Sequence, residues 1–406
     1  MQSSPSDYAD NHVQRVPLHG PEFALDPHRL YKQMRERFGS FVPVEMAPGV
    51  PATLVIGYRA ALAILNDPER FPADPRQWEQ GMRADCPMLP AMGWRPTAIR
   101  NTGHEHLRLR RVVAAALDDV DLNSVHAVVE RTAVPLINAF CVNGSAELAR
   151  EYAGPLVFSV MNDLVGSPPS ISEKAAAGMT QVMDGPDPQE GNRIFEEAFS
   201  DLIQFKRTTP GADITSRLLH HGGDLDDEEI LQQLVMLYGI GAEPTQSLIL
   251  AALLLLLNDS RFGADVMGGA LSTRDALDQV LFEDPPMSNV IFSYPRQPIL
   301  VGGVWLPADQ PVVISIGGCN NDPEIAGGDR TGNRAHLAWS AGPHSCPATS
   351  LGYLIAQCAI DQLLDALPDL ELAVPANELQ WRPGPIQHAL AALPVAFESA
   401  PPLPSS

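Results

Sequence analysis

A single cysteine, Cys346, lies in a glycine- and proline-rich stretch, residues 338–352, just before a long apolar segment. Gly342 and Pro343 would turn the chain, and Pro347 stands where a helix tolerates proline because no backbone N–H is lost. We therefore expect the Cys346 sulfur at a helix N-terminus, where the dipole and the free N–H groups favour a thiolate. Such a thiolate suits a soft, axially open iron centre. The alternative is an ordinary buried cysteine.

The residues around this cysteine resemble the haem-binding loop of the cytochrome P450 superfamily, Phe-Gly-x-Gly-x-His-x-Cys-x-Gly. Gly342, His344 and Cys346 match the pattern at the same spacing, and the sequence has Trp, Ser and Ala where the family has Phe and two of its Gly. The resemblance implies a bound haem b (iron protoporphyrin IX), with Cys346 as the proximal iron ligand.

A second set of polar residues lies upstream, in a segment with helical spacing. His106 and Arg110 are four residues apart, so a helix would place them on one face. In the P450 family a His-x-x-x-Arg pair here binds the haem propionates, for which charge-assisted donors are well suited. Taken alone, the pair equally fits a solvated basic helix face. Arg108 and Arg111 would form a local basic patch that could steer an acidic redox partner.

Residues 228–258 predict one long helix of about 45 Å, at 1.5 Å per residue. Its middle reads Gly-Ile-Gly-Ala-Glu-Pro-Thr, residues 239–245, and such helix-breaking residues predict a groove where a ligand meets the backbone. In the family an acid and an alcohol here relay protons during oxygen activation. The resemblance implies Gly241 beside the cofactor, Glu243 as the acid and Thr245, one residue late, as the alcohol. Water or a substrate hydroxyl is the alternative, because Pro244 holds the alcohol position.

Two other family motifs are degraded. Gln279 and Phe282 stand where the family has the Glu and Arg of its Glu-x-x-Arg ion pair. We expect that ion pair to be absent and replaced by neutral packing, which need not destabilise the protein. Ser293 stands at the position of a third propionate-binding arginine, and Arg296 is a candidate to compensate.

The composition fits a large acidic globular protein. The chain has 406 residues, of which 45% are hydrophobic, and a net charge of −22, which argues against nucleic acid or an anionic membrane as a partner. Five cysteines without a Cys-x-x-Cys pair indicate a reducing compartment. The polar N-terminus shows no signal peptide, and the apolar run 248–257 is too short to span a bilayer. We therefore expect a soluble cytoplasmic protein, and the resemblance to the P450 superfamily, in particular to members that lack Glu-x-x-Arg, implies a bacterial one.

The pattern of elements predicts a mainly α protein with small antiparallel β-sheets. We expect a flexible arm over residues 1–25 and one domain over 26–400. From about residue 28 to residue 398 the order of elements resembles the cytochrome P450 fold, a triangular prism.

Individual segments support this fold class. Alternating residues predict short strands at 41–44 and 52–56, and the run 299–315 predicts a hairpin around a Pro-Ala-Asp turn. Residues 71–100 lack a period and are predicted to be a long loop, which in the family lies over the substrate pocket.

The resemblance implies a haem-thiolate monooxygenase that oxidises a small to medium apolar molecule with O2. Electrons would come from NAD(P)H through a ferredoxin reductase and a ferredoxin. Two alternatives remain open: a haem-binding P450 relative without turnover, acting as a sensor or interaction partner, and a helical scaffold without haem. No sequence feature identifies the substrate.

Overall fold

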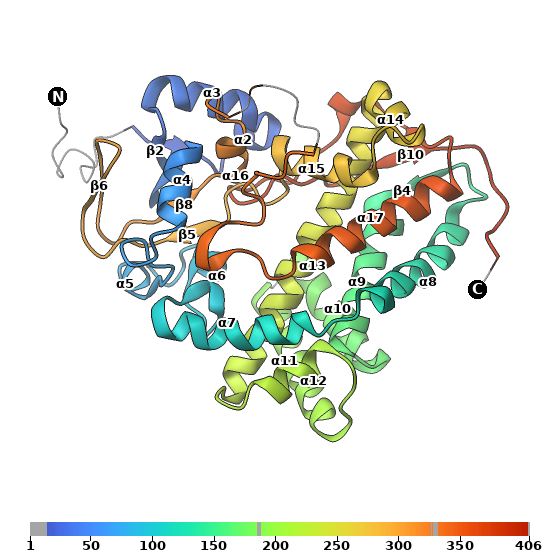
Figure 1. Ribbon diagram of the computed structural model, residues 1–406, viewed down its shortest axis with the longest axis horizontal. Helices are drawn as coiled ribbons and strands as arrows, with labels where there is room; N and C mark the ends of the chain where they lie inside the picture. The colour runs from blue at the N-terminus through green and yellow to red at the C-terminus, as the bar shows by residue number, and fades with distance from the viewer. Residues whose placement is uncertain (1–13, 185–187, 326, 328–331, 405–406) are drawn as a thin grey trace.

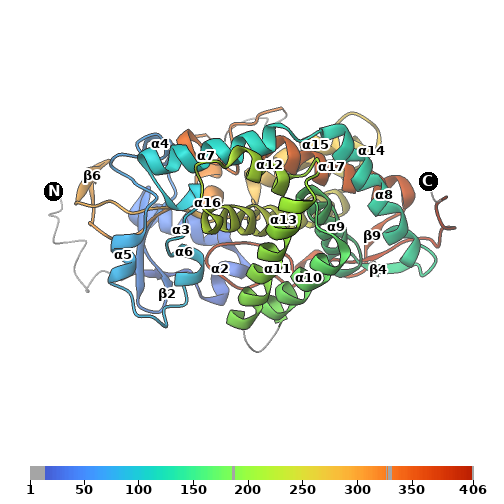
Figure 2. The same cartoon turned by 90° about the horizontal axis from the view of Figure 1, so that it is seen from below.

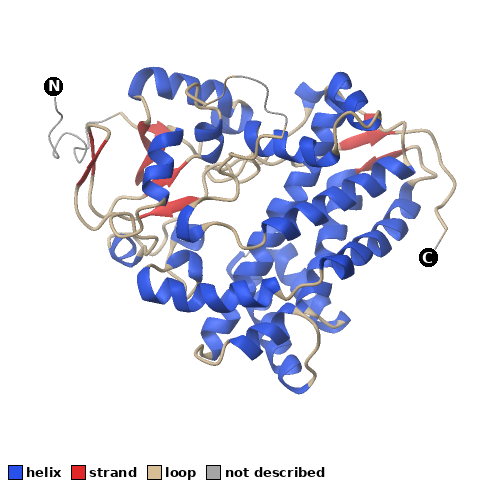
Figure 3. Ribbon diagram, viewed as in Figure 1, coloured by secondary structure: helices blue, strands red, loops and turns tan. Residues whose placement is uncertain are grey.

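A computed structural model describes residues 14–184, 188–325, 327 and 332–404 of the chain. Helices form most of the molecule, and the strands lie in small groups toward two opposite ends (Figures 1 and 3). The expected mainly α fold class is therefore confirmed.

The largest sheet has five strands in the order β1-β2-β3-β8-β5. The predicted strands at 41–44 and 52–56 are its β2 and β3, whose side chains are almost all buried. Two of its strand pairs, β1 with β2 and β3 with β8, are parallel, so this sheet is mixed and not antiparallel as expected. The strands are β1 (Val16–Pro17), β2 (Phe41–Ala47), β3 (Val50–Val55), β8 (Val312–Ile314) and β5 (Ile291–Ser293).

The two smaller sheets are antiparallel, as expected. One consists of β4 (Ser145–Glu147), β10 (Pro394–Ala396) and β9 (Glu371–Leu372), and the other is the hairpin of β6 (Ile299–Val301) and β7 (Val304–Leu306).

The predicted turn of this hairpin at Pro-Ala-Asp is wrong. The chain turns instead at Gly302 and Gly303, whose φ values of 56° and 82° suit glycine. The run after Pro307 forms β8, which is buried and pairs with β3 and β5.

The described part of the expected N-terminal arm is folded. Residues 16–25 contain β1 and helix α2 (Pro21–Leu25), and Leu18 and Phe23 are fully buried. Residues 1–13 lie outside the described part. The expected loop at 71–100 contains short helices: α5 (Arg76–Gln80), α6 (Leu89–Met92) and η1 (Ala98–Arg100).

The predicted long helix at 228–258 is confirmed as α13 (Asp227–Asn258), which runs through the middle of the molecule (Figure 2). It begins with a capping box between Asp226 and Glu229, which satisfies free N–H groups of its first turn. It packs against α9, α11, α15 and α17. Among the described helices it alone is long and apolar enough to cross a membrane, a property that core helices of soluble proteins share.

The remaining helices surround α13 and the large sheet. They are α3 (Pro27–Phe38), α4 (Tyr58–Leu65), α7 (Gly103–Asp118), α8 (Leu122–Phe140), the π-helix η2 (Ala149–Ala153), α9 (Gly154–Val165), α10 (Pro169–Asp184), α11 (Pro188–Thr208), α12 (Ile214–His221), α14 (Ser260–Met267), α15 (Thr273–Glu283), α16 (Ile316–Asn320), η3 (Gly342–His344), α17 (Thr349–Ala366) and η4 (Ala376–Glu378).

Candidate functional site

A cavity of about 330 Å³ lies where α13, α7, strand β5 and the loop before α17 come together. Its size is within the range of small-molecule sites. Cys346 lines this cavity, so the cysteine singled out by the sequence is not packed away in the core. Most of the other lining side chains are apolar, among them Met161, Leu164, Leu237 and Leu248.

The loop that presents Cys346 is held by a tight turn. Gly342 has a φ of +67°, and a Cβ there would lie 2.3 Å from the carbonyl oxygen of Leu65, so only glycine fits. The Cys346 backbone N–H donates to the Trp339 carbonyl at 2.8 Å. These contacts therefore fix the loop before and after His344, which is the last residue of η3.

The sulfur of Cys346 faces the start of α17. Burial raises the pKa of its thiol, whereas a hydrogen bond from the Ala348 N–H, the charge of Arg110 and the Thr349 hydroxyl lower it. Ala348 is the N-cap of α17, so the sulfur lies beside a helix N-terminus. A cation bound to the sulfur would offset the cost of burying a thiolate here.

One wall of the cavity is rich in cationic and imidazole groups. Arg110 and His344 line the cavity, and the His106 ring lies on that of His344 with centroids 4.1 Å apart. Arg110 donates to the Ser345 carbonyl at 2.5 Å and forms no ion pair within the described part of the chain. The His106 Nε2 atom is buried and has no hydrogen-bond partner there. The structure therefore brings these three predicted residues together.

The electrostatics of this wall favour an anion. Burial, followed by the charges of His106, Arg110 and Arg100, lowers the pKa of His344 to about 4. Burial and Arg110 also lower the pKa of His106. Both imidazoles are therefore neutral donors near pH 7, beside a guanidinium that keeps its charge.

These residues fit a haem b. The buried sulfur offers a thiolate ligand for iron, and the orphaned His106 nitrogen and unpaired Arg110 offer donors to carboxylates. Gly241 also lines the cavity, and a Cβ there would come within 3.0 Å of the Met161 Cε, so glycine lets α13 approach α9 closely.

The structure separates the two residues expected to deliver protons. Thr245 lines the cavity, and its Oγ1 donates to the Gly241 carbonyl at 2.7 Å. Glu243 is not among the lining residues: its Oε1 accepts from the Ser247 hydroxyl at 3.1 Å and lies 3.8 Å from the Arg382 Nη1. Burial raises the pKa of Glu243. Two residues along a helix turn a side chain by about 200°, which accounts for the separation.

Helix α13 continues through Pro244, which also lines the cavity. Proline has no N–H, so the carbonyl of Ile240 lacks its usual helical donor. The predicted break is therefore local and lies where α13 meets the cavity.

Arg296 is not brought to the cavity. Its Nη2 lies 3.2 Å from the Asp74 Oδ2, and its side chain is 60% exposed. Ser293 lines the cavity as the last residue of β5, but the chain then leaves the sheet. The structure therefore gives no support to Arg296 as a replacement for the missing arginine.

Arg100 is a site residue that the sequence analysis missed. It ends η1, lines the cavity, and lies over the Phe292 ring with its Cζ 5.5 Å from the centroid. The segment 71–100 shows no period, so its only sequence signal is an arginine shortly before the His106 helix. Its place in the cavity depends on contacts with β5, distant in sequence.

The Glu-x-x-Arg ion pair is absent as expected, but a different ion pair, which the sequence analysis did not foresee, joins α15 to the cysteine loop through Asp278, one residue before Gln279. Asp278 is buried, and its Oδ2 accepts from the Arg334 Nε at 3.1 Å. Its Oδ1 accepts from the Tyr353 hydroxyl at 2.5 Å and lies 3.5 Å from the Arg274 Nε. Arg334 precedes the cysteine loop and Tyr353 lies on α17, so Asp278 links both sides of that loop to α15.

The motif positions themselves behave as expected for neutral packing. Phe282 is buried and meets the His336 ring edge to face, with centroids 5.2 Å apart. Gln279 donates to Glu283 on the same helix at 2.6 Å. Arg330, a further basic residue of this region, lies outside the described residues.

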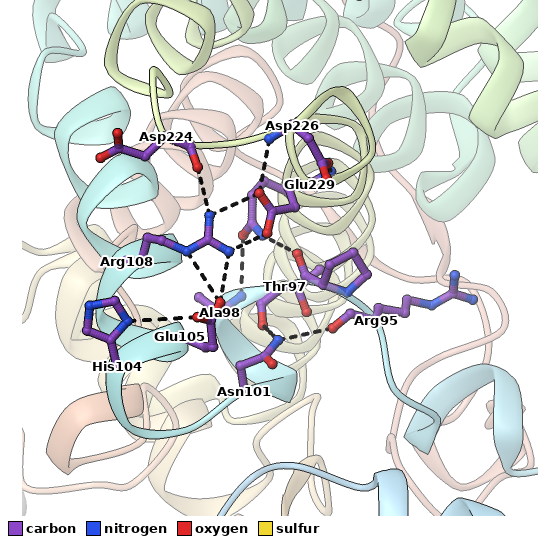
Figure 4. A network of polar contacts seen from close by, with 12 residues as sticks. Arg95, Thr97, Ala98, Asn101, His104, Glu105, Arg108, Asp224, Asp226 and Glu229 are labelled. Carbon is purple, nitrogen blue, oxygen red and sulfur yellow. Dashed lines mark hydrogen bonds and ion pairs between the residues drawn. The ribbon is translucent and has the colours of Figure 1, made fainter.

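The expected basic patch on α7 is largely neutralised, and Figure 4 shows the contacts of Arg108. Arg108 forms hydrogen-bonded ion pairs with Glu105 and Glu229, and Arg111 pairs with Asp224 at 2.9 Å. These contacts fasten α7 to the start of α13, and they leave neither guanidinium free to steer a partner.

The comparisons with known proteins agree with this geometry. No protein-family model matches the chain. The 2-hydroxy-5-methyl-1-naphthoate 7-hydroxylase of Streptomyces carzinostaticus is 27% identical over 395 residues, 92% of this chain and 96% of that protein. The cytochrome P450 monooxygenase PikC of Streptomyces venezuelae is 28% identical over 393 residues, 93% and 92% of the two chains.

A solved structure is also similar over its whole length. CYP154C4 from a Streptomyces species, solved with testerone bound, matches with a TM-score of 0.86 and 27% identity over 95% of this chain and 98% of that one. The helical fold places a cysteine and a wall of arginine and imidazole groups at one cavity. In sequence and in fold the chain is similar to bacterial cytochrome P450s over more than nine tenths of its length.

Proposed function

We propose that Cys346 binds the iron of a haem b and that the protein is a cytochrome P450 monooxygenase. The observation that carries the proposal is the position of the Cys346 sulfur on a cavity whose adjoining wall holds Arg110, His106 and His344 without a carboxylate partner in the described residues. When bound, the haem supplies the redox chemistry that inserts oxygen into an organic substrate.

The chain supplies the binding groups for this cofactor. Arg110 and His344, with His106 behind them, would donate to the two propionates, and the neutral imidazoles avoid an excess of positive charge. Gly342 holds the turn that presents Cys346, and Gly241 keeps α13 close to the cavity.

Proton delivery would use Thr245 at the cavity and Glu243 behind it. The Thr245 hydroxyl is the polar group of α13 at the cavity surface, and it is anchored on the Gly241 carbonyl. Burial raises the pKa of Glu243 above its ordinary value, which is the direction that favours a proton donor. Glu243, which lies next to Ser247 and Arg382, would pass protons toward the cavity through a water molecule.

The substrate would be a small to medium, mostly apolar organic molecule. Apart from Thr245, Ser293 and the cationic wall, the cavity is lined mainly by aliphatic, aromatic and methionine side chains. One relative is named for its hydroxylation of a naphthoate, and CYP154C4 was solved with testerone bound. Both compounds belong to this class of molecule.

Electrons would come from NAD(P)H through a ferredoxin reductase and a ferredoxin, in the bacterial cytoplasm. The net charge of −22 makes nucleic acid and anionic membrane surfaces unfavourable partners. Because Arg108 and Arg111 are paired, the ferredoxin would have to dock through other groups.

The test is the absorption spectrum of the purified haem-replete protein. Reduced protein under carbon monoxide should show the Soret band characteristic of thiolate ligation, and Cys346→Ala should abolish it. Cys358→Ala, a buried cysteine of α17 that does not line the cavity, is the matched control and should keep the band. Absence of the band in the unmodified protein would overturn the proposal. Product formation with redox proteins supplied would exclude a sensor without turnover.

A further inference from the structure

Arg100 places a guanidinium at the cavity, and no carboxylate of the described residues pairs with it. It lines the cavity, donates through Nη2 to the Ala91 carbonyl, and forms no ion pair within the described residues. Among the residues that the structure describes, Phe292 is the aromatic ring over which this guanidinium lies. An arginine keeps its proton even when it is buried, so a partly buried guanidinium without a counter-charge is costly unless an anion binds to it.

Hydrogen bonds hold the backbone on both sides of Arg100, and Figure 4 labels Arg95, Thr97 and Asn101 among the residues that form them. The Asn101 amide donates to the carbonyls of Arg95 and Thr97 at 3.2 and 2.8 Å. Gln233 of α13 donates to the Pro96 carbonyl at 2.7 Å and accepts from the Ala98 N–H at 3.4 Å. These hydrogen bonds fix the segment that contains Arg100, so an ordered backbone positions its guanidinium at the cavity.

Arg100 contacts the strand, β5, on which the family's third propionate-binding arginine is missing. Phe292, on which its guanidinium lies, directly precedes Ser293, where the sequence lacks the third propionate-binding arginine of the family. Ser293 is buried, lines the same cavity, and donates its hydroxyl to the Val312 carbonyl at 3.4 Å. It offers no charge of its own there.

The charges of the site also balance. A haem b carries two propionate carboxylates, and Arg110 and Arg100 are the two arginines that line the cavity in the described part of the chain. Two guanidiniums would compensate two carboxylates, and the His106 and His344 imidazoles are further donors.

We propose that Arg100 binds a haem propionate and takes over the role of the arginine missing at Ser293. The inference rests on the proposed haem site. The competing occupant of the same guanidinium is a carboxylate of the substrate, which the experiment below separates.

The experiment compares Arg100→Leu, Arg100→Lys and, as a matched control, Arg95→Leu. Arg95 belongs to the same segment, but its side chain points to Glu196 at the surface. The rate of haem transfer from the substrate-free ferric protein to apomyoglobin should rise about 10- to 100-fold in Arg100→Leu, because a charge-assisted hydrogen bond is lost. Arg100→Lys should lie between Arg100→Leu and the unmodified protein, and Arg95→Leu should not differ from the unmodified protein.

A second readout responds to charge and not to packing. Removing a positive charge near the haem disfavours the reduced state, so the reduction potential should become more negative in Arg100→Leu and stay nearly unchanged in Arg100→Lys. Adding Ser293→Arg to Arg100→Leu should slow haem transfer again, since it returns a guanidinium to the strand position.

The inference is overturned if Arg100→Leu keeps both the haem-transfer rate and the potential of the unmodified protein. A loss of affinity for lauric acid, but not for methyl laurate, with haem retention unchanged would assign Arg100 to a substrate carboxylate instead. If the unmodified protein shows no thiolate Soret band, the proposed function itself fails, which is a distinct result.

Discussion

Asp278 and Arg334 form an ion pair that connects α15 to the loop before Cys346, with 3.1 Å between the Arg334 Nε and the Asp278 Oδ2. The same carboxylate accepts a hydrogen bond from Tyr353, on the helix that follows the cysteine. The Asp278 side chain is only 5% exposed. One buried acid thus fastens the two ends of the cysteine loop, although the Glu-x-x-Arg pattern is missing from this helix.

Asp278→Asn should lower the free energy of unfolding by about 3 kcal/mol, because it removes the buried charge that pairs with Arg334 and Arg274. Urea denaturation monitored by circular dichroism measures this loss. Asp369→Asn, an exposed aspartate just after α17, is the control and should change stability by less than about 0.5 kcal/mol. Equal effects of the two substitutions would contradict the role given to Asp278.

The contribution of Asp278 should also depend on pH. Burial alone would raise the pKa of its carboxyl, but hydrogen bonds from His336, Tyr353 and Arg334 and the charge of Arg274 outweigh it, so the pKa lies below the ordinary value of 3.8. For a depressed acid pKa, stability is fully present above the unfolded value and is lost as the pH falls through the folded one. The stability difference between the unmodified protein and Asp278→Asn should be constant from pH 7 to about pH 5 and shrink below about pH 4. A difference that is constant down to pH 3 would show that Asp278 acts by packing alone.

Thr245→Ala should reduce product formed per NAD(P)H consumed on the order of 100-fold, the lower end expected for loss of a proton-transfer group. The reason is that the Thr245 hydroxyl is at the cavity, whereas Glu243 faces Ser247 and Arg382. Glu243→Gln should therefore have the smaller effect, and Thr245→Ser should retain most of the coupling. A larger loss in Glu243→Gln than in Thr245→Ala would mean that the Glu243 side chain turns into the cavity during turnover.

Arg108→Gln should destabilise the protein by about 1–2 kcal/mol, because the guanidinium joins α7 to Glu229 on α13 and both side chains are mostly buried. Arg111→Gln is a matched control on the same helix: its pair with Asp224 is exposed, and its loss should cost less than about 0.5 kcal/mol. Thermal unfolding of both variants measures the difference. The affinity for a ferredoxin, measured by titration, should be the same in Arg108→Gln and in the unmodified protein. A lower affinity without a change in stability would show that Arg108 takes part in docking.

The local features of this protein follow from its sequence. The Gly342-to-Cys346 spacing, the apolar period of α13 and the alternation of β2 and β3 are short-range patterns, and short-range sterics and burial determine what they form. The same holds for the His106–Arg110 spacing, because four residues on a helix share a face whatever the rest of the chain does.

The tertiary structure decided which side chains meet. Arg100 lies over Phe292, and Asp278 accepts a hydrogen bond from Tyr353, a residue 75 positions away. No local sequence pattern encodes either contact. The side of α13 that Glu243 faces, and the pairing of Arg296 with Asp74, likewise depend on what packs against them. A buried charge takes its partner from whichever element brings an opposite charge or a donor within reach, and only the assembled fold determines which element that is.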